Sequence, residues 1–201
     1  MNTAFEIEDF QQARILRFRS EDGTNRLSGA TVLVLTDAVR QLSGDNRPLI
    51  ITGNEHFFSA GADLNEIAAL TGPTAYEFAR MGQELMQLVA DFPAQVYAAV
   101  SGYCMGGGLD LALSCHHRIA TPNAIFGHRG AALGLITGWG GTQRLPRIIG
   151  KGRALEMFLA AEKIRAEQAL QIGLIDAIAE DPVASALRQG RQTSSPDAEN
   201  A

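Results

Sequence analysis

The sequence lacks the marks of several protein classes. It contains no cluster of basic residues, and 17 lysines and arginines against 22 acidic residues give a net charge of −5. Nucleic-acid-binding proteins need a basic surface, so nucleic acid is not expected as a partner. No uncharged apolar run reaches the ~20 residues of a membrane-spanning helix. The N-terminus is acidic and has no apolar signal core, which predicts a cytoplasmic protein with no membrane partner.

Cysteine is scarce, and its placement excludes a metal-binding framework. Cys104 and Cys115 are the two cysteines, both in apolar sequence, and neither has the spacing of a metal site. The run Cys115-His116-His117 contains possible ligands, but no carboxylate or further cysteine completes a set at usable spacing. We therefore expect no metal and a reduced intracellular protein. The two histidines are interpreted as structural, at the end of a helix.

Apolar residues are plentiful, and their pattern alternates along the chain. With 46% hydrophobic residues in 201, the chain can form one globular domain with a full core. Strands are expected at 13–18, 48–52, 95–100, 118–120 and 175–178, and helices at 32–42, 74–92, 109–114, 153–161 and 166–172. This alternation indicates an α/β fold, with no internal repeat of fixed period. Residues 1–185 are predicted to form the core, and the polar stretch 186–201 a disordered tail.

A glycine run stands out within this pattern. From Tyr103 the chain reads Y-C-M-G-G-G-L-D-L-A-L. A Walker phosphate loop needs G-K-[S/T] after the glycines, and a dinucleotide site needs G-x-G-x-x-G; neither is present. Asp110 in the first helical turn would also repel a pyrophosphate. Two hypotheses remain: backbone N–H groups aimed at an oxyanion, or a tight turn that lets a helix and a strand pack closely.

A second segment favours the oxyanion hypothesis. The stretch S-A-G-A-D-L, from Ser59 to Leu64, follows the predicted strand 48–52, as the glycine run follows the strand 95–100. Two such turns would place two backbone N–H groups at the carboxyl edge of one sheet. That is the minimum for a two-donor oxyanion hole around a thioester carbonyl.

Three segments together carry a family resemblance. F-F-S-A-G-A-D-L, A-A-V-S-G-Y-C-M-G-G-G-L-D-L-A-L and G-W-G-G-T-Q-R-L-P-R-I-I-G resemble the crotonase superfamily, the enoyl-CoA hydratase/isomerase family, in register from about residue 13 to 178. The resemblance implies an α/β fold, a crotonase-like spiral of ββα units, and a homo-oligomer of three or six subunits. It also implies an acyl-CoA thioester as substrate and no cofactor, since coenzyme A is part of the substrate.

The resemblance also assigns roles to single residues. The N–H groups of Ala62 and Gly107 match the two oxyanion donors, which would stabilise a thioester enolate. The substrate-binding residues that it implies lie in the same two turns, where binding is largely through the backbone: Ala60, Asp63, Leu64 and Gly106.

The sequence departs from the family at the acid–base positions. Hydratases hold and activate one water with two glutamates. The first position is Asp110, whose reach is shorter by one methylene, about 1.3–1.5 Å. The second is Gly130, which has no side chain, so a two-glutamate hydration cannot be written; a glutamate introduced there is predicted to raise hydratase activity. An aspartate that other members carry near Thr137 is also absent.

His128 is a candidate for the missing acid/base, because histidine ordinarily titrates near neutral pH. If its segment is extended, His128 and Gly130 face the same way and Arg129 the other. The alternative is a surface or subunit-contact histidine. Trp139 in G-W-G-G either lines the acyl pocket or packs in the core or between subunits.

Two functions follow. One is an enoyl-CoA hydratase/isomerase-like enzyme in which the oxyanion hole stabilises the enolate and Asp110 is the remaining acid/base. The other is a non-catalytic acyl-CoA-binding or scaffold homologue that lost the second glutamate, with Gly130 in its place. Family members continue for some tens of residues with helices that cover the acyl pocket and join subunits. The chain therefore resembles a C-terminally short member, and its trimer or hexamer depends on what the short C-terminus permits.

Overall fold

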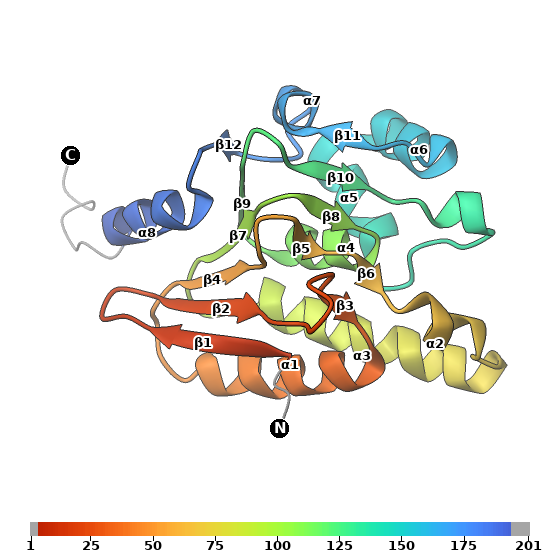
Figure 1. Cartoon of the computed structure of the whole chain (residues 1–201), viewed down its shortest axis with the longest axis horizontal. Coiled ribbons are helices and arrows are strands. Elements are labelled where there is room, and N and C mark those ends of the chain that lie inside the picture. The colour runs from red at the N-terminus through yellow and green to blue at the C-terminus, as the bar shows by residue number, and fades with distance from the viewer. Residues whose placement is uncertain (1–3, 194–201) are drawn as a thin grey trace.

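The fold repeats one unit, in which a first strand joins a large sheet, a second strand joins a small sheet, and a helix follows. The computed structural model describes residues 4–193 (Figure 1). Three such units are β4 (Leu49–Thr52), β5 (Phe57–Ser59) and α2 (Leu64–Ala68); β7 (Val96–Val100), β8 (Tyr103–Met105) and α4 (Gly107–Ser114); β9 (His117–Ala120), β10 (Ile125–Gly127) and α5 (Gly141–Ile149). The predicted ββα pattern is confirmed. Because the connections differ in length, the sequence shows no fixed period.

The larger sheet has six strands in the order β1-β2-β4-β7-β9-β12. Strands β2 (Arg14–Phe18) to β12 (Ala177–Ile178) run parallel, and β1 (Phe5–Asp9) pairs antiparallel with β2. Every residue of β4 and β7 is buried, as their unbroken apolar runs predict for central strands covered on both faces. Helices α1 (Gly29–Leu42) and α3 (Gly72–Ala90) pack together beneath this sheet in Figure 1.

The C-terminal helix corrects the predicted domain boundary. α8 runs from Pro182 to Thr193, so residues 186–193 of the expected tail are helical. Ala186 is only 1% exposed, and it packs with Ile15, Ile50 and Tyr97 in a second core beneath the helix. The helix covers a face of the sheet that would otherwise be exposed apolar surface. Residues 194–201 lie outside the described part of the chain, so the tail prediction for them stays a prediction.

The smaller sheet carries the turns that matter for function. Its order is β11-β10-β8-β5, with β11 (Ile164–Arg165) antiparallel at one edge, while β3 (Arg26–Leu27) pairs with β6 (Gly61–Ala62). The chain crosses from β7 to β8 at Gly102, where φ is +60° and a Cβ would lie 2.0 Å from the carbonyl oxygen of His56. The two small-residue turns therefore follow neighbouring parallel strands, β5 and β8, of the small sheet. The buried strands expected at 48–52 and 95–100 are present as β4 and β7, and each turn follows its buried strand after one short strand, β5 or β8, that the sequence analysis did not predict.

The remaining predicted elements are present, with boundaries shifted by a few residues. They are α6 (Lys151–Ala160) and α7 (Ala166–Gln171), with a 3₁₀ turn at Gly130–Leu133 between β10 and α5. Among residues 4–193, no helix has the length and apolar character needed to cross a bilayer.

Candidate active site

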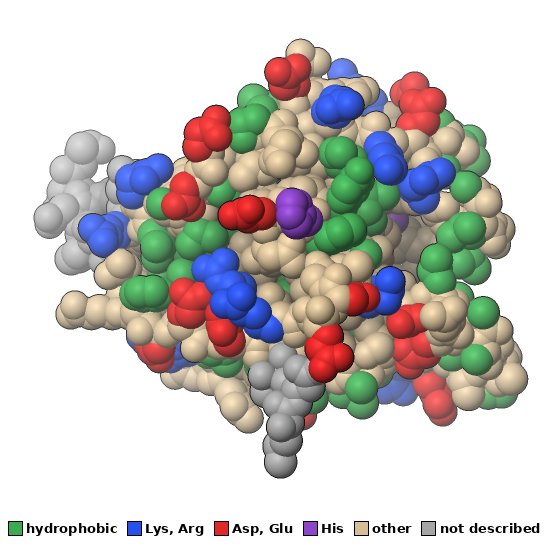
Figure 2. Space-filling view, viewed as in Figure 1, with side chains coloured by type: hydrophobic (Ala, Val, Ile, Leu, Met, Phe, Trp, Pro, Cys, Tyr) green, Lys and Arg blue, Asp and Glu red, His purple; other side chains and the backbone are tan. Residues whose placement is uncertain are grey.

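The smaller sheet, α2, α3, the start of α4 and residues 128–139 enclose a cavity of about 670 Å³. Figure 2 shows hydrophobic side chains around a hollow in the right half of the view. Seven of the eight residues predicted for the site line this cavity: Ala60, Ala62, Leu64, Gly106, Gly107, Asp110 and His128. Segments that are far apart in sequence therefore meet at one place, as predicted.

Asp63 is the exception. Its carboxylate accepts the N–H groups of Asn65 at 2.8 Å and Glu66 at 3.4 Å, so it caps the N-terminus of α2. An aspartate one residue before a helix is a common N-cap. The Asp63 side chain therefore has a structural role outside the cavity, and the predicted substrate contact, which was expected largely through the backbone, stays a prediction.

The two turns bring the backbone of Ala62 and Gly107 together. A Cβ built on Gly61 would lie 3.0 Å from the nitrogen of Gly107, and one built on Gly107 would lie 3.3 Å from the nitrogen of Ala62. Gly107 is the first residue of α4, where an N–H group has no partner within the helix and the helix dipole is positive. The arrangement can present backbone N–H groups to an anionic oxygen.

Glycine and one serine hold this arrangement. Gly61 has φ of +92°, and a Cβ there would lie 2.5 Å from the carbonyl oxygen of Met105, so a side chain would push the two turns apart. The hydroxyl oxygen of Ser59 accepts the N–H of Gly61 at 3.0 Å and donates to the carbonyl of Asn25 at 2.7 Å. The first turn is thereby tied to Asn25, the residue before β3.

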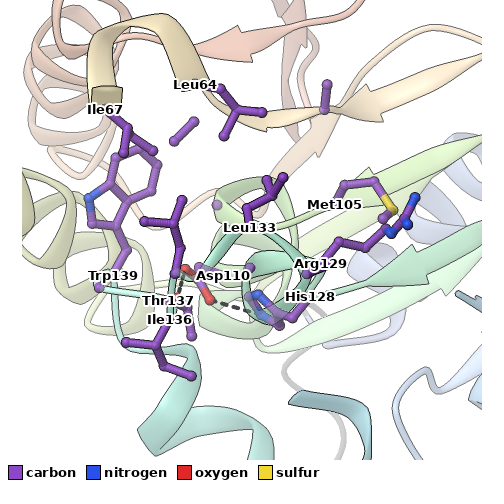
Figure 3. A pocket seen from close by; sticks show the side chains of 18 of the residues that line it. Leu64, Ile67, Met105, Asp110, His128, Arg129, Leu133, Ile136, Thr137 and Trp139 are labelled. Carbon is purple, nitrogen blue, oxygen red and sulfur yellow. Dashed lines mark hydrogen bonds and ion pairs between the residues drawn. The ribbon is translucent and has the colours of Figure 1, made fainter. Parts of the chain in front are cut away.

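Asp110 lies in the first turn of α4 and is 2% exposed. One carboxylate oxygen, Oδ2, accepts a hydrogen bond from the hydroxyl of Thr137 (Figure 3). The other, Oδ1, lies 3.2 Å from Nε2 of His128, which is 4% exposed. The geometry of this contact is not that of a hydrogen bond, and within residues 4–193 neither atom has a hydrogen-bond partner. Because buried polar atoms are almost always satisfied, the pair is suited to bind a third group on the cavity side of these two atoms.

A glycine makes this pairing possible. Gly141 begins α5, and a Cβ there would lie 2.2 Å from Oδ1 of Asp110 and 3.0 Å from Nε2 of His128. Any side chain at this position would separate the two groups. The sequence analysis did not identify Gly141 or Thr137 as site residues, although both lie in or beside the G-W-G-G-T segment that it used for the resemblance.

Gly130 leaves no usable space for a glutamate. A Cβ at Gly130 would lie 2.7 Å from the carbonyl oxygen of Leu135, so a side chain would displace the 130–135 turn. The predicted gain in hydratase activity from a glutamate at this position is therefore no longer expected. The opposite orientation of His128 and Arg129 was predicted only for an extended segment, and this condition is not met. Strand β10 ends at Gly127 and the 3₁₀ turn begins at Gly130, so strand alternation does not apply and Arg129 lines the cavity.

The cavity differs in charge between its two ends. Trp139 and Arg129 lie on opposite sides of Asp110 in Figure 3. Arg129 and Lys163 line the cavity, and in the described part of the chain neither forms an ion pair; the ammonium of Lys163 lies 4.8 Å from the ring centroid of Tyr103. Asp110 is the single acidic side chain in the described lining.

The Cys115-His116-His117 run has the structural role predicted for it. Burial raises the pKa of Cys115 to about 12 and that of Cys104 well above its usual value, so both free thiols stay protonated near neutral pH. Nδ1 of His116 accepts the N–H of Val96 at 2.9 Å, and the ring of His117 stacks on Tyr97. Among the residues that the structure describes, no group of three or more potential ligands could hold a metal ion.

Comparison with known proteins shows the family of the chain. The family model described as enoyl-CoA hydratase/isomerase matches residues 12–194. "Crotonyl-CoA hydratase" of Syntrophomonas wolfei is 38% identical over 175 residues, covering 86% of this chain and 67% of that protein. "Probable enoyl-CoA hydratase" of Bacillus subtilis is 41% identical over 160 residues, covering 78% of this chain and 62% of that protein. The chain thus spans about two thirds of the length of these relatives.

Solved structures show the same fold. DspI of Pseudomonas aeruginosa superposes with a TM-score of 0.90 at 34% identity, covering 95% of this chain and 74% of that one. An enoyl-CoA hydratase from Thermoplasma volcanium superposes with a TM-score of 0.91 at 29% identity, covering 96% and 79%. Through its sequence match and its fold, the chain belongs to the enoyl-CoA hydratase/isomerase family.

Proposed function

We propose that this protein is an acyl-CoA lyase or isomerase of the hydratase/isomerase type. The observation that carries the proposal is the buried pair of Asp110 and His128. Their facing atoms lie 3.2 Å apart, have no hydrogen-bond partner within residues 4–193, and belong to the same cavity as the Ala62 and Gly107 amides. A protein that merely bound acyl-CoA would have no need to bury two unsatisfied polar groups, which costs stability.

In the proposed mechanism the thioester carbonyl oxygen accepts the N–H groups of Ala62 and Gly107. Negative charge that develops on this oxygen as the enolate forms is then stabilised by donors already in position, and each donor of this kind contributes about 3 kcal/mol. The positive end of α4 adds to the effect, because Gly107 is its first residue.

His128 is proposed to supply the second acid/base that Gly130 cannot. For hydration, a water bound on the cavity side of Asp110 Oδ1 and His128 Nε2 gives its hydroxyl to Cβ and its other proton to one of the two groups, while the second group gives a proton to Cα. For isomerisation, one group takes a proton from one carbon and returns it to another. The hydrogen bond from Thr137 positions the Asp110 carboxylate in both cases.

The cationic end of the cavity supports an anionic substrate. Arg129 and Lys163 are exposed at that end, whereas the whole protein carries a net charge of −5. The phosphates of coenzyme A would find cations there, and the acyl group would lie toward the apolar end. We propose that no cofactor is needed beyond the coenzyme A of the substrate.

We also propose a homo-oligomer, a trimer or hexamer, as is usual in the family. Some apolar side chains that line the cavity are still 38–65% exposed, which supports an interface that would cover them: Leu64, Leu133, Leu135 and Ile136. Sedimentation analysis tests this, and a monomer at all concentrations would contradict it. The cytoplasmic location stays a prediction.

The decisive experiment follows the enone absorbance of crotonyl-CoA, and of a 3-enoyl-CoA, with wild type, Asp110→Asn and the control Asp63→Asn. Asp110→Asn keeps the shape of the side chain but cannot transfer protons, so turnover should fall at least about 10²-fold. Asp63 is an acid outside the cavity, and its asparagine variant can still cap α2, so that variant should keep its activity.

The rival function is the non-catalytic acyl-CoA-binding protein, favoured by the absence of an acid/base side chain at Gly130. Tight binding of acyl-CoA without turnover, and without exchange of the Cα proton for solvent deuterium, would establish it in place of the enzyme.

A further inference from the structure

Trp139 is held rigidly against the backbone half of the site. Its side chain is 3% exposed, and its indole N–H donates to the carbonyl of Phe78 on α3 at 3.1 Å. The rings of Phe78 and Trp139 are 5.1 Å apart between centroids and tilted by 39°. A buried indole with its N–H satisfied and an aromatic neighbour has little freedom to move.

Two glycines on different helices make room for the indole. A Cβ built on Gly82 of α3 would lie 2.2 Å from Cδ1 and Nε1 of Trp139, and one built on Gly107 would lie 2.5 Å from Cζ3. The five-membered part of the ring therefore rests on α3, and the six-membered part touches the residue whose N–H is proposed to bind the carbonyl oxygen. The indole thus bridges the space between α3 and the start of α4.

We propose that Trp139 sets the upper size limit of the acyl group and restricts the site to short-chain acyl-CoA thioesters. A carbonyl oxygen on the Gly107 amide leaves its acyl carbons beside the indole, at the apolar end of the cavity, where Ile67, Phe78 and Ile136 also lie. The cations at the other end take the charged part of the substrate. This inference rests on the proposed acyl-CoA substrate and adds which acyl groups fit.

The test measures equilibrium binding of butyryl-CoA and octanoyl-CoA by calorimetry to wild type, Trp139→Phe and Trp139→Ala. Saturated thioesters are used because they report size preference even in a protein that turns nothing over. Removing ring atoms should shift the ratio of the two Kd values toward octanoyl-CoA by about tenfold or more, since each methylene matters in an apolar pocket. Thermal melting shows which variants are folded. If Trp139→Ala does not fold, the result for Trp139→Phe tests the proposal.

A second variant moves the indole by a substitution at a residue that does not itself line the cavity. Gly82→Ala would press the ring toward the cavity and should shift the ratio toward butyryl-CoA. Gly72→Ala is its matched control on the same helix, because a Cβ there meets nothing within 4 Å. Trp139 is the only tryptophan of the chain, so its fluorescence in wild type should change as acyl-CoA binds.

The outcomes separate this inference from the proposed function. If folded Trp139 variants keep the wild-type Kd ratio, the size-limit role is overturned, even where crotonyl-CoA is turned over. If the ratio shifts but no enoyl-CoA reacts, the size limit stands and the enzyme proposal fails. Fluorescence that acyl-CoA leaves unchanged while calorimetry detects binding would place the acyl group away from Trp139 and overturn the inference.

Discussion

The two halves of the site use different parts of the chain, backbone groups in one and side chains in the other. The half at Gly61–Ala62 and Gly106–Gly107 consists of backbone, held by glycine turns and the hydroxyl of Ser59. The other half consists of side chains: Asp110 and the residues of segment 128–141 that face it. Gly141, at the start of α5, lets these side chains come close together. Catalytic activity should therefore fall when atoms are added to the backbone half and when atoms are removed from the side-chain half.

The largest expected effect comes from adding a methyl group to the backbone half. In Gly61→Ala the new Cβ would meet the carbonyl of Met105 at 2.5 Å, so the Ala62 and Gly107 amides should separate. Loss of one donor predicts a fall in kcat of about 10²–10³-fold. The positive φ adds a loss of stability of about 1–3 kcal/mol, measured by urea unfolding.

Gly150→Ala is the matched control for that variant. Its φ of +86° is close to the +92° of Gly61, but a Cβ there meets nothing within 4 Å, and the residue does not line the cavity. It should lose similar stability and keep its activity. Equal losses of activity in both variants would show that backbone strain, and not the position of the donors, lowers the rate.

A smaller effect should follow from removing the imidazole of the side-chain half. His128→Gln keeps a polar group beside Asp110 but cannot transfer a proton at neutral pH, so kcat for crotonyl-CoA hydration should fall about 10²-fold. His56→Gln, an exposed histidine outside the cavity, should leave kcat unchanged. A His128→Gln protein with wild-type kcat would leave Asp110 as the only acid/base.

The smallest expected effect is a pH dependence of folding stability that comes from His116, a residue outside the cavity. Burial lowers the pKa of His116 from 6.5, and its Nδ1 accepts the N–H of Val96, which requires an unprotonated nitrogen. The unfolded chain therefore binds this proton more readily than the folded protein. The stabilisation from His116 is complete above pH 6.5 and is lost as pH falls through the lowered folded-state pKa.

Urea unfolding of wild type and His116→Asn between pH 5 and 8 checks this. Asparagine can still accept the N–H of Val96 but does not titrate, so its free energy of unfolding should depend less on pH. An identical pH dependence in both proteins would contradict the assignment. The comparison also shows how much of a loss of activity at low pH is caused by unfolding. The remainder is caused by titration within the side-chain half of the site.

The elements predicted best were those whose sequence pattern alone specifies their environment. The unbroken apolar runs of β4 and β7 predicted buried central strands, and the long amphipathic pattern predicted α3. The short strands β5, β6, β8 and β10 were missed, because two or three residues carry no period. The part of helix α8 from residue 186 onward was assigned to a tail because it is largely polar. Only the packing of α8 on the large sheet explains its apolar residues Val183, Ala186 and Leu187.

The sequence by itself determined the alternation of strands and helices, the two small-residue turns, and the absence of a side chain at Gly130. Each of these depends on residue type or local order. Only the tertiary structure decided that Asp110 meets His128 and Thr137, that Arg129 enters the cavity, and that Trp139 touches Gly107. These contacts join segments 18 to 32 residues apart, and they exist because α4 packs against α5 with glycine at the points of closest approach.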